Sequence, residues 1–288
     1  MAIVFLILSI VFSTSINLIF RWFKDYKVDK FQAIIVNYLV CFVVGYLLSS
    51  DRDILSHLSS SWFPYCILLG FLFVAIFFSM ALTTEKMGIS VTAVSGKMSV
   101  VVPILFAFIY LNEEVSFLFV FGVILSLLSI YFISVKEELA LDRRYFLLPI
   151  IVFLGGGIID TSLKILESEF SDIVAMETIS YSIFLGAFLA GLVILFIRTR
   201  RGASAFTKKS IVAGILLGVP NYFSIYFLLI AIVSFKRKSA LVFGINNVGV
   251  VVLSTLLSIL IFRENLNKKN KIGLALAVIS ISIIAYAN

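Results

Sequence analysis

The chain has 288 residues, of which 61% are hydrophobic and 14% are charged. Soluble domains are about 45–50% apolar and about 25% charged, so this composition excludes an ordinary soluble globular protein. The net charge of +7 does not indicate nucleic-acid binding, because the basic residues are dispersed over short connections between apolar segments. The sequence therefore predicts an integral membrane protein with no nucleic-acid partner.

Ten apolar stretches are long enough to cross a membrane. A helix needs about 20 apolar residues to cross a hydrocarbon core roughly 30 Å thick, and only helices or closed barrels satisfy their backbone in lipid. In chain order the stretches are 2–20, 31–49, 62–82, 87–110, 116–135, 146–166, 173–197, 210–232, 239–262 and 270–287. The first has no basic leader and no small-residue cleavage site, so we expect a retained helix and not a signal peptide. The predicted fold is an all-α integral membrane protein with ten transmembrane helices.

The basic residues predict an orientation. Of the 23 Lys and Arg residues, 17 lie in connections that follow odd-numbered spans and four in connections that follow even-numbered spans. The other two, Lys97 and Lys164, lie inside spans. Because cytoplasmic loops carry an excess of Lys and Arg, we expect the odd-numbered connections in the cytoplasm and both termini outside it.

The chain aligns with itself in order, which predicts an internal repeat. The matches include Asn17 with Asp160 and Tyr38 with Tyr181 at an offset of 143 residues, LLG at 68–70 with LLG at 216–218 at 148, and Glu113 with Glu264 at 151. The expected repeats are 1–136 and 145–288. Five helices per copy is an odd number, so the second copy is inverted in the membrane. Inverted repeats place a substrate site near the bilayer midplane, and access alternates by rocking one half against the other.

Two stretches carry a resemblance to a known family. The fourth span ends in the sequence SVVVPILFAFIYLNEEVS, and the ninth span ends in the sequence VVVLSTLLSILIFRENLN. An apolar helix with a central proline, here Pro103, that ends in an acidic turn, here Glu113 and Glu264, resembles the EamA branch of the drug/metabolite transporter superfamily. Ser254 stands in the second half where the first has Pro103. The resemblance covers nearly the whole chain.

This resemblance implies a secondary transporter of amino acids, related metabolites or drugs. It also implies that helices 1–4 and 6–9 surround a central cavity and that helices 5 and 10 are peripheral. Members of the family usually keep both termini in the cytoplasm, whereas the distribution of basic residues in this chain predicts the reverse.

Lys97 is the charged residue of a run from Met87 to Tyr110 that is otherwise uncharged. An ionised side chain at the bilayer centre costs about 2.5–3.5 kcal/mol on insertion scales, so Lys97 is expected to face a cavity or a carboxylate. Asp160 and Glu177 are the candidate partners. Two interpretations remain open: a structural ion pair, or a lysine that binds an anionic group of a substrate while Asp160 or Glu177 accepts a proton or fixes the lysine.

Further polar residues are predicted to line the same cavity. Ser9, Ser13 and Asn17 recur every four residues in the first span and form one stripe. The alternative for each single residue is a hydrogen bond between helices, worth about 0.6 kcal/mol on average. The substrate-binding candidates are Ser13, Asn17, Asn37, Tyr38, Lys97, Asp160, Tyr181, Asn221, Asn246 and Asn247, and the proton-coupling candidates are Asp160 and Glu177.

Three smaller features have simple interpretations. His57, in the connection DRDILSHLSSS, is expected to be solvated. Cys41 and Cys66 lie within spans, where a thiol usually packs as a small hydrophobe. Gly155–Gly157 indicate either a hinge that exposes backbone carbonyls or close packing of helices.

The sequence favours a secondary transporter or exchanger of small metabolites, such as amino acids or related anionic compounds, in the cell (inner or plasma) membrane. It predicts no enzyme, because the spans hold no His and no matched Cys or acid cluster, and neither a cofactor nor a metal site. The expected partners are a small-molecule substrate and membrane lipid, with protons as the candidate coupling ion. A monomer is expected, with a dimer as the alternative. The alternative function is a non-transporting membrane binding or scaffold protein.

The orientation can be tested with a fluorescent reporter that folds only in the cytoplasm. Fused after Asn288, it is expected to be dark, because the excess of Lys and Arg places the C-terminus outside. Fused into the connection at 201–205, it is expected to fluoresce. Bright C-terminal fusions would contradict the orientation that the charges predict.

Overall fold

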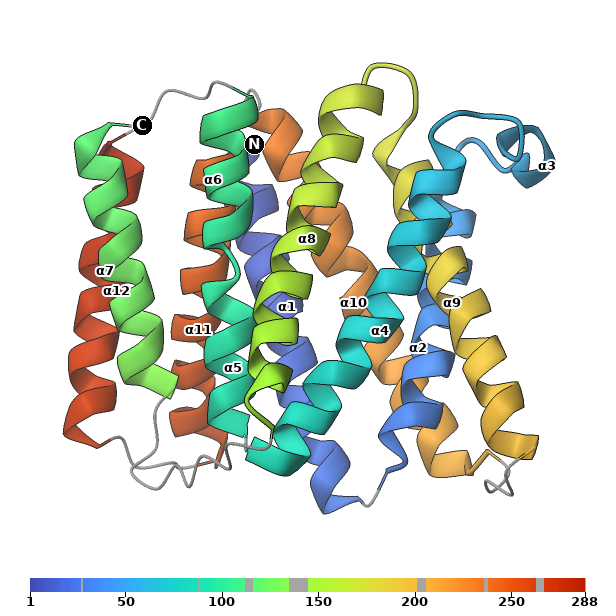
Figure 1. Cartoon of the computed structure of the whole chain (residues 1–288), viewed down its shortest axis with the longest axis horizontal. Coiled ribbons are helices and arrows are strands. Elements are labelled where there is room, and N and C mark those ends of the chain that lie inside the picture. The colour runs from blue at the N-terminus through green and yellow to red at the C-terminus, as the bar shows by residue number, and fades with distance from the viewer. Residues whose placement is uncertain are drawn as a thin grey trace. The chain divides into compact units, whose positions relative to one another are not determined.

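The structure is a computed structural model that describes residues 1–26, 28–87, 89–111, 116–134, 145–200, 206–235, 238–262 and 267–287. Within these ranges all regular secondary structure is helical (Figure 1). Glu113 and Glu264 of the acidic turns, and Asn288, lie outside the described residues.

The helices form two compact units, and each unit takes residues from both halves of the chain. The first unit comprises Met1–Val74 and Ile165–Val233, and the second comprises Ala75–Lys164 and Ser234–Asn288. The boundaries between them fall within α4 (Phe63–Met87) and α8 (Leu147–Phe170) and at the end of α10.

The first unit is built on α1, α2, α3, α9 and α10, with the beginning of α4 and the end of α8. The bounds are Ala2–Asp25 for α1, Lys30–Leu48 for α2, Ile54–His57 for α3, Met176–Arg200 for α9 and Lys208–Ser234 for α10. Helix α2 packs along α9. Helix α2 begins where it does because the carboxylate of Asp29 accepts hydrogen bonds from the free N–H groups of Phe31 and Gln32.

The second unit contains α5, α6, α7, α11 and α12. Their bounds are Ile89–Met98 for α5, Val101–Tyr110 for α6, Phe117–Ser134 for α7, Ser239–Phe262 for α11 and Lys268–Tyr286 for α12. Helix α7 packs along α12, and α11 contacts α6, α7 and α12. A capping box between Asn267 and Asn270 begins α12, which satisfies two backbone N–H groups at that end.

Among the described residues, eight helices are long and apolar enough to cross a membrane, which gives the chain the character of a multi-pass membrane protein. Their apolar stretches are Ala2–Phe20, Lys30–Leu48, Phe63–Met80, Leu147–Phe170, Met176–Arg198, Lys208–Ser234, Ser239–Leu257 and Lys268–Tyr286. Eight of the ten expected spans thus correspond to helices of this kind. The fourth and fifth expected spans contain the shorter apolar stretches Ser95–Tyr110 and Phe117–Phe132.

The expected helix over 87–110 is wrong in one respect, because it is two helices. Helix α5 ends at Met98 and α6 begins at Val101, so Ser99 and Val100 interrupt the span (Figure 1). Pro103 explains the interruption: it has no N–H to donate to the carbonyl four residues earlier, which belongs to Ser99. That carbonyl instead accepts a hydrogen bond from the Val102 N–H at 2.9 Å. Pro103 therefore lies in the first turn of α6, where the missing N–H is tolerated.

Glycines bring helices of the first unit into close contact. A Cβ added to Gly70 on α4 would lie 2.4 Å from the Ile183 carbonyl oxygen of α9. A Cβ added to Gly218 on α10 would lie 2.5 Å from the Cβ of Val40 on α2. Small residues at these positions let the helices approach as they do in membrane bundles.

The glycine run of α8 serves close packing as well. A Cβ added to Gly157 would lie 2.4 Å from the Cβ of Val102, and one added to Gly155 would lie 2.0 Å from the Cδ1 of Ile76. All three glycines fall inside a continuous helix. Of the two interpretations of this run, close helix packing is the one confirmed.

Gly70→Ala is expected to lower the free energy of unfolding by about 1–3 kcal/mol, because the new methyl group meets the backbone of α9. Gly244→Ala is the matched control, since its Cβ would lie 3.6 Å from the nearest atom, the Cδ1 of Ile284. The control is expected to be neutral or to gain up to about 1 kcal/mol from helix propensity. Thermal unfolding of the purified variants measures both effects. Equal melting temperatures would contradict the close contact of α4 with α9.

Candidate functional site

Lys97 occupies the last turn of α5 in the second unit and is partly buried. Its Nζ donates a hydrogen bond to the Oδ1 of Asn247 on α11, at 3.4 Å. The Nδ2 of Asn247 donates to the Phe243 carbonyl oxygen at 3.2 Å, which turns the amide oxygen toward the lysine. The side chain of Asn247 is thus positioned by its own helix to receive a positive charge.

Asp160 on α8 is the acidic group that acts on Lys97. The carboxyl of Asp160 and the ammonium of Lys97 attract each other. In the part of the chain that the structure describes, however, no ion pair at contact distance joins them. An ammonium group has three donors, so Lys97 keeps hydrogen-bonding capacity beyond its contact with Asn247.

The interruption of the fourth span lies next to this lysine. Ser99, two residues after Lys97, donates its hydroxyl to the Gly96 carbonyl oxygen at 2.7 Å. Gly156 of α8 packs against it, since a Cβ added there would lie 2.9 Å from the Ser99 Oγ. Asp160 follows Gly156 by one helical turn, so close packing at Gly156 positions the carboxyl near Lys97. Irregular backbone within a span is tolerated where it is buried in protein or lines a cavity.

A second set of candidates meets in the first unit. The Asn221 Nδ2 of α10 donates to the Asn37 Oδ1 of α2 at 3.1 Å. Cys41 donates its thiol to the Gly218 carbonyl oxygen at 3.2 Å, so it is more than a small hydrophobe. Asn37 is fully buried, and its Nδ2 has no hydrogen-bond partner among the described residues.

Tyrosines and Glu177 complete this set. Tyr226 donates its hydroxyl to the Glu177 Oε1 at 3.3 Å. Tyr222 stacks on Tyr226 with ring centroids 5.7 Å apart, and Tyr38 is buried against Phe184. The Oη of Tyr222 is buried and has no hydrogen-bond partner within the described ranges. Glu177 thus lies beside aromatic rings, with a tyrosine hydroxyl as its hydrogen-bond donor.

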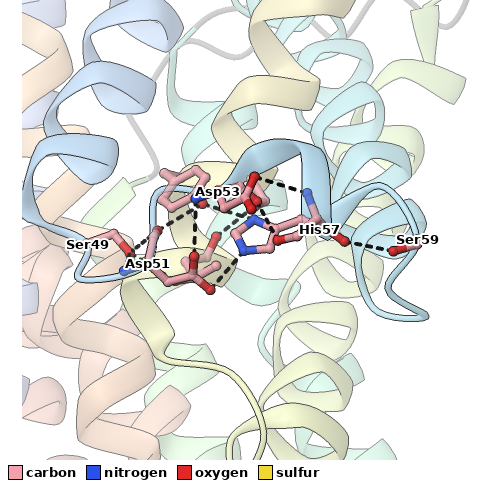
Figure 2. A network of polar contacts seen from close by, with 9 residues as sticks. Ser49, Asp51, Asp53, His57 and Ser59 are labelled. Carbon is pink, nitrogen blue, oxygen red and sulfur yellow. Dashed lines mark hydrogen bonds and ion pairs between the residues drawn. The ribbon is translucent and has the colours of Figure 1, made fainter.

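Tyr181 belongs to a different group of contacts. Its Oη lies 3.1 Å from the His57 Nδ1 and 3.2 Å from the Asp51 carbonyl oxygen. The Nε2 of His57 lies 2.9 Å from the Asp51 Oδ2, and Figure 2 shows the two side chains directed toward each other. The expectation of a solvated His57 is wrong, because the residue is only 4% exposed and the Trp62 ring lies 5.1 Å from its own.

The remaining candidates divide between the units. In α1, Ser9 is buried and donates to the Ser224 carbonyl oxygen of α10, so it joins two helices. Ser13 is partly buried, and Asn17 is exposed. Asn246 is buried in α11 beside Asn247. The structure therefore brings Lys97, Asp160 and Asn247 together in one unit and Asn37, Asn221 and Glu177 into the other.

Comparisons with known proteins extend over nearly the whole chain. No family model matches it. It is 28% identical to an uncharacterized protein of Haemophilus influenzae over 291 aligned positions, which cover 98% of this chain and 97% of that one. A protein of known crystal structure matches with a TM-score of 0.77 and 16% identity, covering 99% of this chain and 97% of the other. At that identity the likeness shows a shared fold.

The contact between Asn37 and Asn221 can be tested by a double-mutant cycle with Asn37→Leu and Asn221→Leu. Each single variant is expected to lose about 1–3 kcal/mol, because it removes the partner of an amide that is buried in Asn37 and partly buried in Asn221. The double variant is expected to lose less than the sum, by about 0.5–3 kcal/mol. Thermal or denaturant unfolding measures the three values. Strict additivity would contradict the hydrogen bond.

Proposed function

We propose that the chain is a secondary transporter of small metabolites that works by alternating access. The observation that carries the proposal is Lys97, a cation within an expected span, at the end of a helix that is interrupted two residues later. Intramembrane charges are rare and mark substrate or ion pathways. Interrupted helices in transporters provide the substrate and ion sites.

The contacts of Lys97 favour an anionic substrate group, such as the carboxylate of an amino acid. Asn247 engages the ammonium with one long hydrogen bond, and Asp160 attracts it without contact. A carboxylate can therefore be bound by the remaining donors, while Asp160 holds the lysine in place or accepts a proton. Glu177, with its tyrosine donor, is the second candidate for proton coupling.

Contacts between equivalent helices support the inverted repeat on which alternating access would depend. In the expected repeat, α2 corresponds to α9, α5 and α6 together correspond to α11, and α7 corresponds to α12. In three observed contacts a helix packs against its own equivalent in the other copy: α2 with α9, α6 with α11, and α7 with α12. The pair α5 with α7 maps onto α11 with α12, which is also observed. Such a set is expected of two copies related by a pseudo-two-fold axis.

One pair of glycine contacts supports the same relation at the level of residues. Gly70 and Gly218 are equivalent at the offset of 148, and Val40 and Ile183 are equivalent at 143. In the structure Gly218 packs on Val40, and Gly70 packs on the backbone of Ile183. Two contacts that exchange under the repeat are hard to explain by the general similarity of apolar helices.

The proposal places the chain in the cell (inner or plasma) membrane, as a monomer with lipid around it. The alternative remains a non-transporting binding or scaffold protein. Such a protein has no need of two pseudo-symmetric halves or of a charge beside an interrupted helix, and this is why we favour transport.

A thermal-shift screen of anionic amino acids and metabolites, run on the native protein, Lys97→Met and Lys97→Arg, tests the substrate contact. A ligand at about 100 times its dissociation constant stabilises the native protein by about 2.7 kcal/mol. The shift is expected to vanish in Lys97→Met and to persist in part in Lys97→Arg, which keeps the positive charge. An equal shift in Lys97→Met would contradict the role of the lysine.

Exchange of the same ligand in proteoliposomes separates transport from binding. Labelled ligand outside is expected to enter faster when unlabelled ligand is present inside, because a transporter returns more readily when loaded. A ligand that stabilises the protein and is never exchanged would favour the binding or scaffold protein.

A further inference from the structure

The connection between α2 and α4 contains the single histidine of the chain. Here we call residues 49–62 the cap segment. The cap segment contacts α9 at two points. The Ser49 Oγ lies 2.9 Å from the Thr178 Oγ1, and the His57 Nδ1 lies 3.1 Å from the Tyr181 hydroxyl. Trp62 and Phe63 pack against the imidazole, with ring centroids 5.1 and 6.5 Å away.

The hydrogen atoms of this group can be assigned from the acceptors. A carboxylate has no hydrogen to donate, so the contact of 2.9 Å between the Asp51 Oδ2 and the His57 Nε2 requires a hydrogen on the nitrogen. The Tyr181 hydroxyl has one hydrogen, and the Asp51 backbone carbonyl at 3.2 Å can only accept it. The contact of 3.1 Å between Tyr181 and the His57 Nδ1 then requires a hydrogen on that nitrogen as well.

All three hydrogen bonds are therefore satisfied together only when His57 is an imidazolium. If the Nδ1 loses its proton, the tyrosine hydrogen must serve either the imidazole or the Asp51 carbonyl oxygen, and one bond is lost. If the Nε2 loses its proton, two acceptors face each other. We propose that Asp51, His57 and Tyr181 form a proton-binding site that fastens the cap segment to α9 when His57 is protonated and loosens it when His57 is neutral.

The surrounding charges fit this assignment. From the cap segment, the Asp53 N–H donates to the Asp51 Oδ1 at 3.2 Å, whereas the guanidinium of Arg52 binds the carbonyl oxygens of Ser49 and Leu47 and leaves the carboxylate to His57. From α2, Tyr46 packs edge-on against Tyr181 at 5.8 Å. The side chain of Asp51 is 55% exposed, so solvent protons reach the site through it.

The pH range of the site follows from its two ionisable partners. The hydrogen bond from His57, then the one from the Asp53 N–H, hold the pKa of Asp51 below its ordinary value. Because the pKa of Asp51 is lowered on folding, the stability that this carboxylate contributes is fully present above the ordinary aspartate pKa. This stability is lost as pH falls through the lowered pKa. Histidine changes its charge between about pH 5 and 8. The cap segment is thus fastened while Asp51 is a carboxylate and His57 is an imidazolium, and it is released when His57 loses a proton.

A nitroxide on Ser59→Cys, an exposed position of the cap segment, reports this fastening by electron paramagnetic resonance. Both native cysteines are buried, so the label selects the new thiol. The mobile fraction of the spectrum is expected to rise several-fold between about pH 5.5 and 8. The same label at Lys269→Cys, exposed on α12, is expected to show no such change.

Two variants and one further signal complete the test. In the Ser59→Cys background, His57→Gln keeps a donor for Asp51 but has no imidazole to protonate, and Tyr181→Phe removes the two of the three bonds that the tyrosine hydroxyl makes. Both variants are expected to abolish the pH dependence. In the otherwise native protein, 15N-labelled histidine gives the ring signals of one residue, which are expected to change from imidazolium to neutral over the pH range in which the label is released. A neutral ring throughout that range, or a mobility change of equal size in His57→Gln, would overturn the proposal.

Discussion

The missing N–H of Pro103 is the constraint from which the candidate site follows. In lipid, each backbone group must find its partner within the protein, and an unsatisfied one costs several kcal/mol. Because Pro103 cannot donate to the Ser99 carbonyl oxygen, α5 ends at Met98 and the carbonyl turns to the Val102 N–H. The last turn of α5 then becomes a helix end with Lys97 in it. A positive charge at a helix C-terminus is favoured by the helix dipole, so the interruption also lowers the cost of holding the lysine in the span.

Close packing is the second constraint, and it works through residues that have no side chain. Gly156 and Gly157 bring α8 against Ser99 and Val102, on either side of the interruption. The same approach places Asp160 where its charge acts on Lys97. The site in the second unit is thus a consequence of one proline and a glycine run, with polar residues supplied by neighbouring turns.

The sequence predicted the helices well and their contacts poorly. Apolar length and bounding charges located the eight of the ten expected spans that correspond to long apolar helices among the described residues, because both are local properties that lipid imposes. The interruption at Ser99 was missed although Pro103 was noted, since proline alone does not say whether a membrane helix bends or breaks. Lys97 and Asn247 were both candidates, but 150 positions separate them, and no local pattern connects them.

His57 shows why such long-range partners decide the chemistry of a residue. Its own neighbourhood, rich in serine and aspartate, is typical of a solvated connection, and six residues separate it from Asp51. Trp62 and Phe63 cover the imidazole from nearby in the chain, whereas its Nδ1 contacts Tyr181, which lies 124 positions away on another helix. One such contact converts a surface side chain into a group whose proton content is coupled to the position of a whole segment. The chemical environment of a polar residue in a membrane connection therefore depends on which helix the connection packs against. The fold determines that helix, and the local sequence does not.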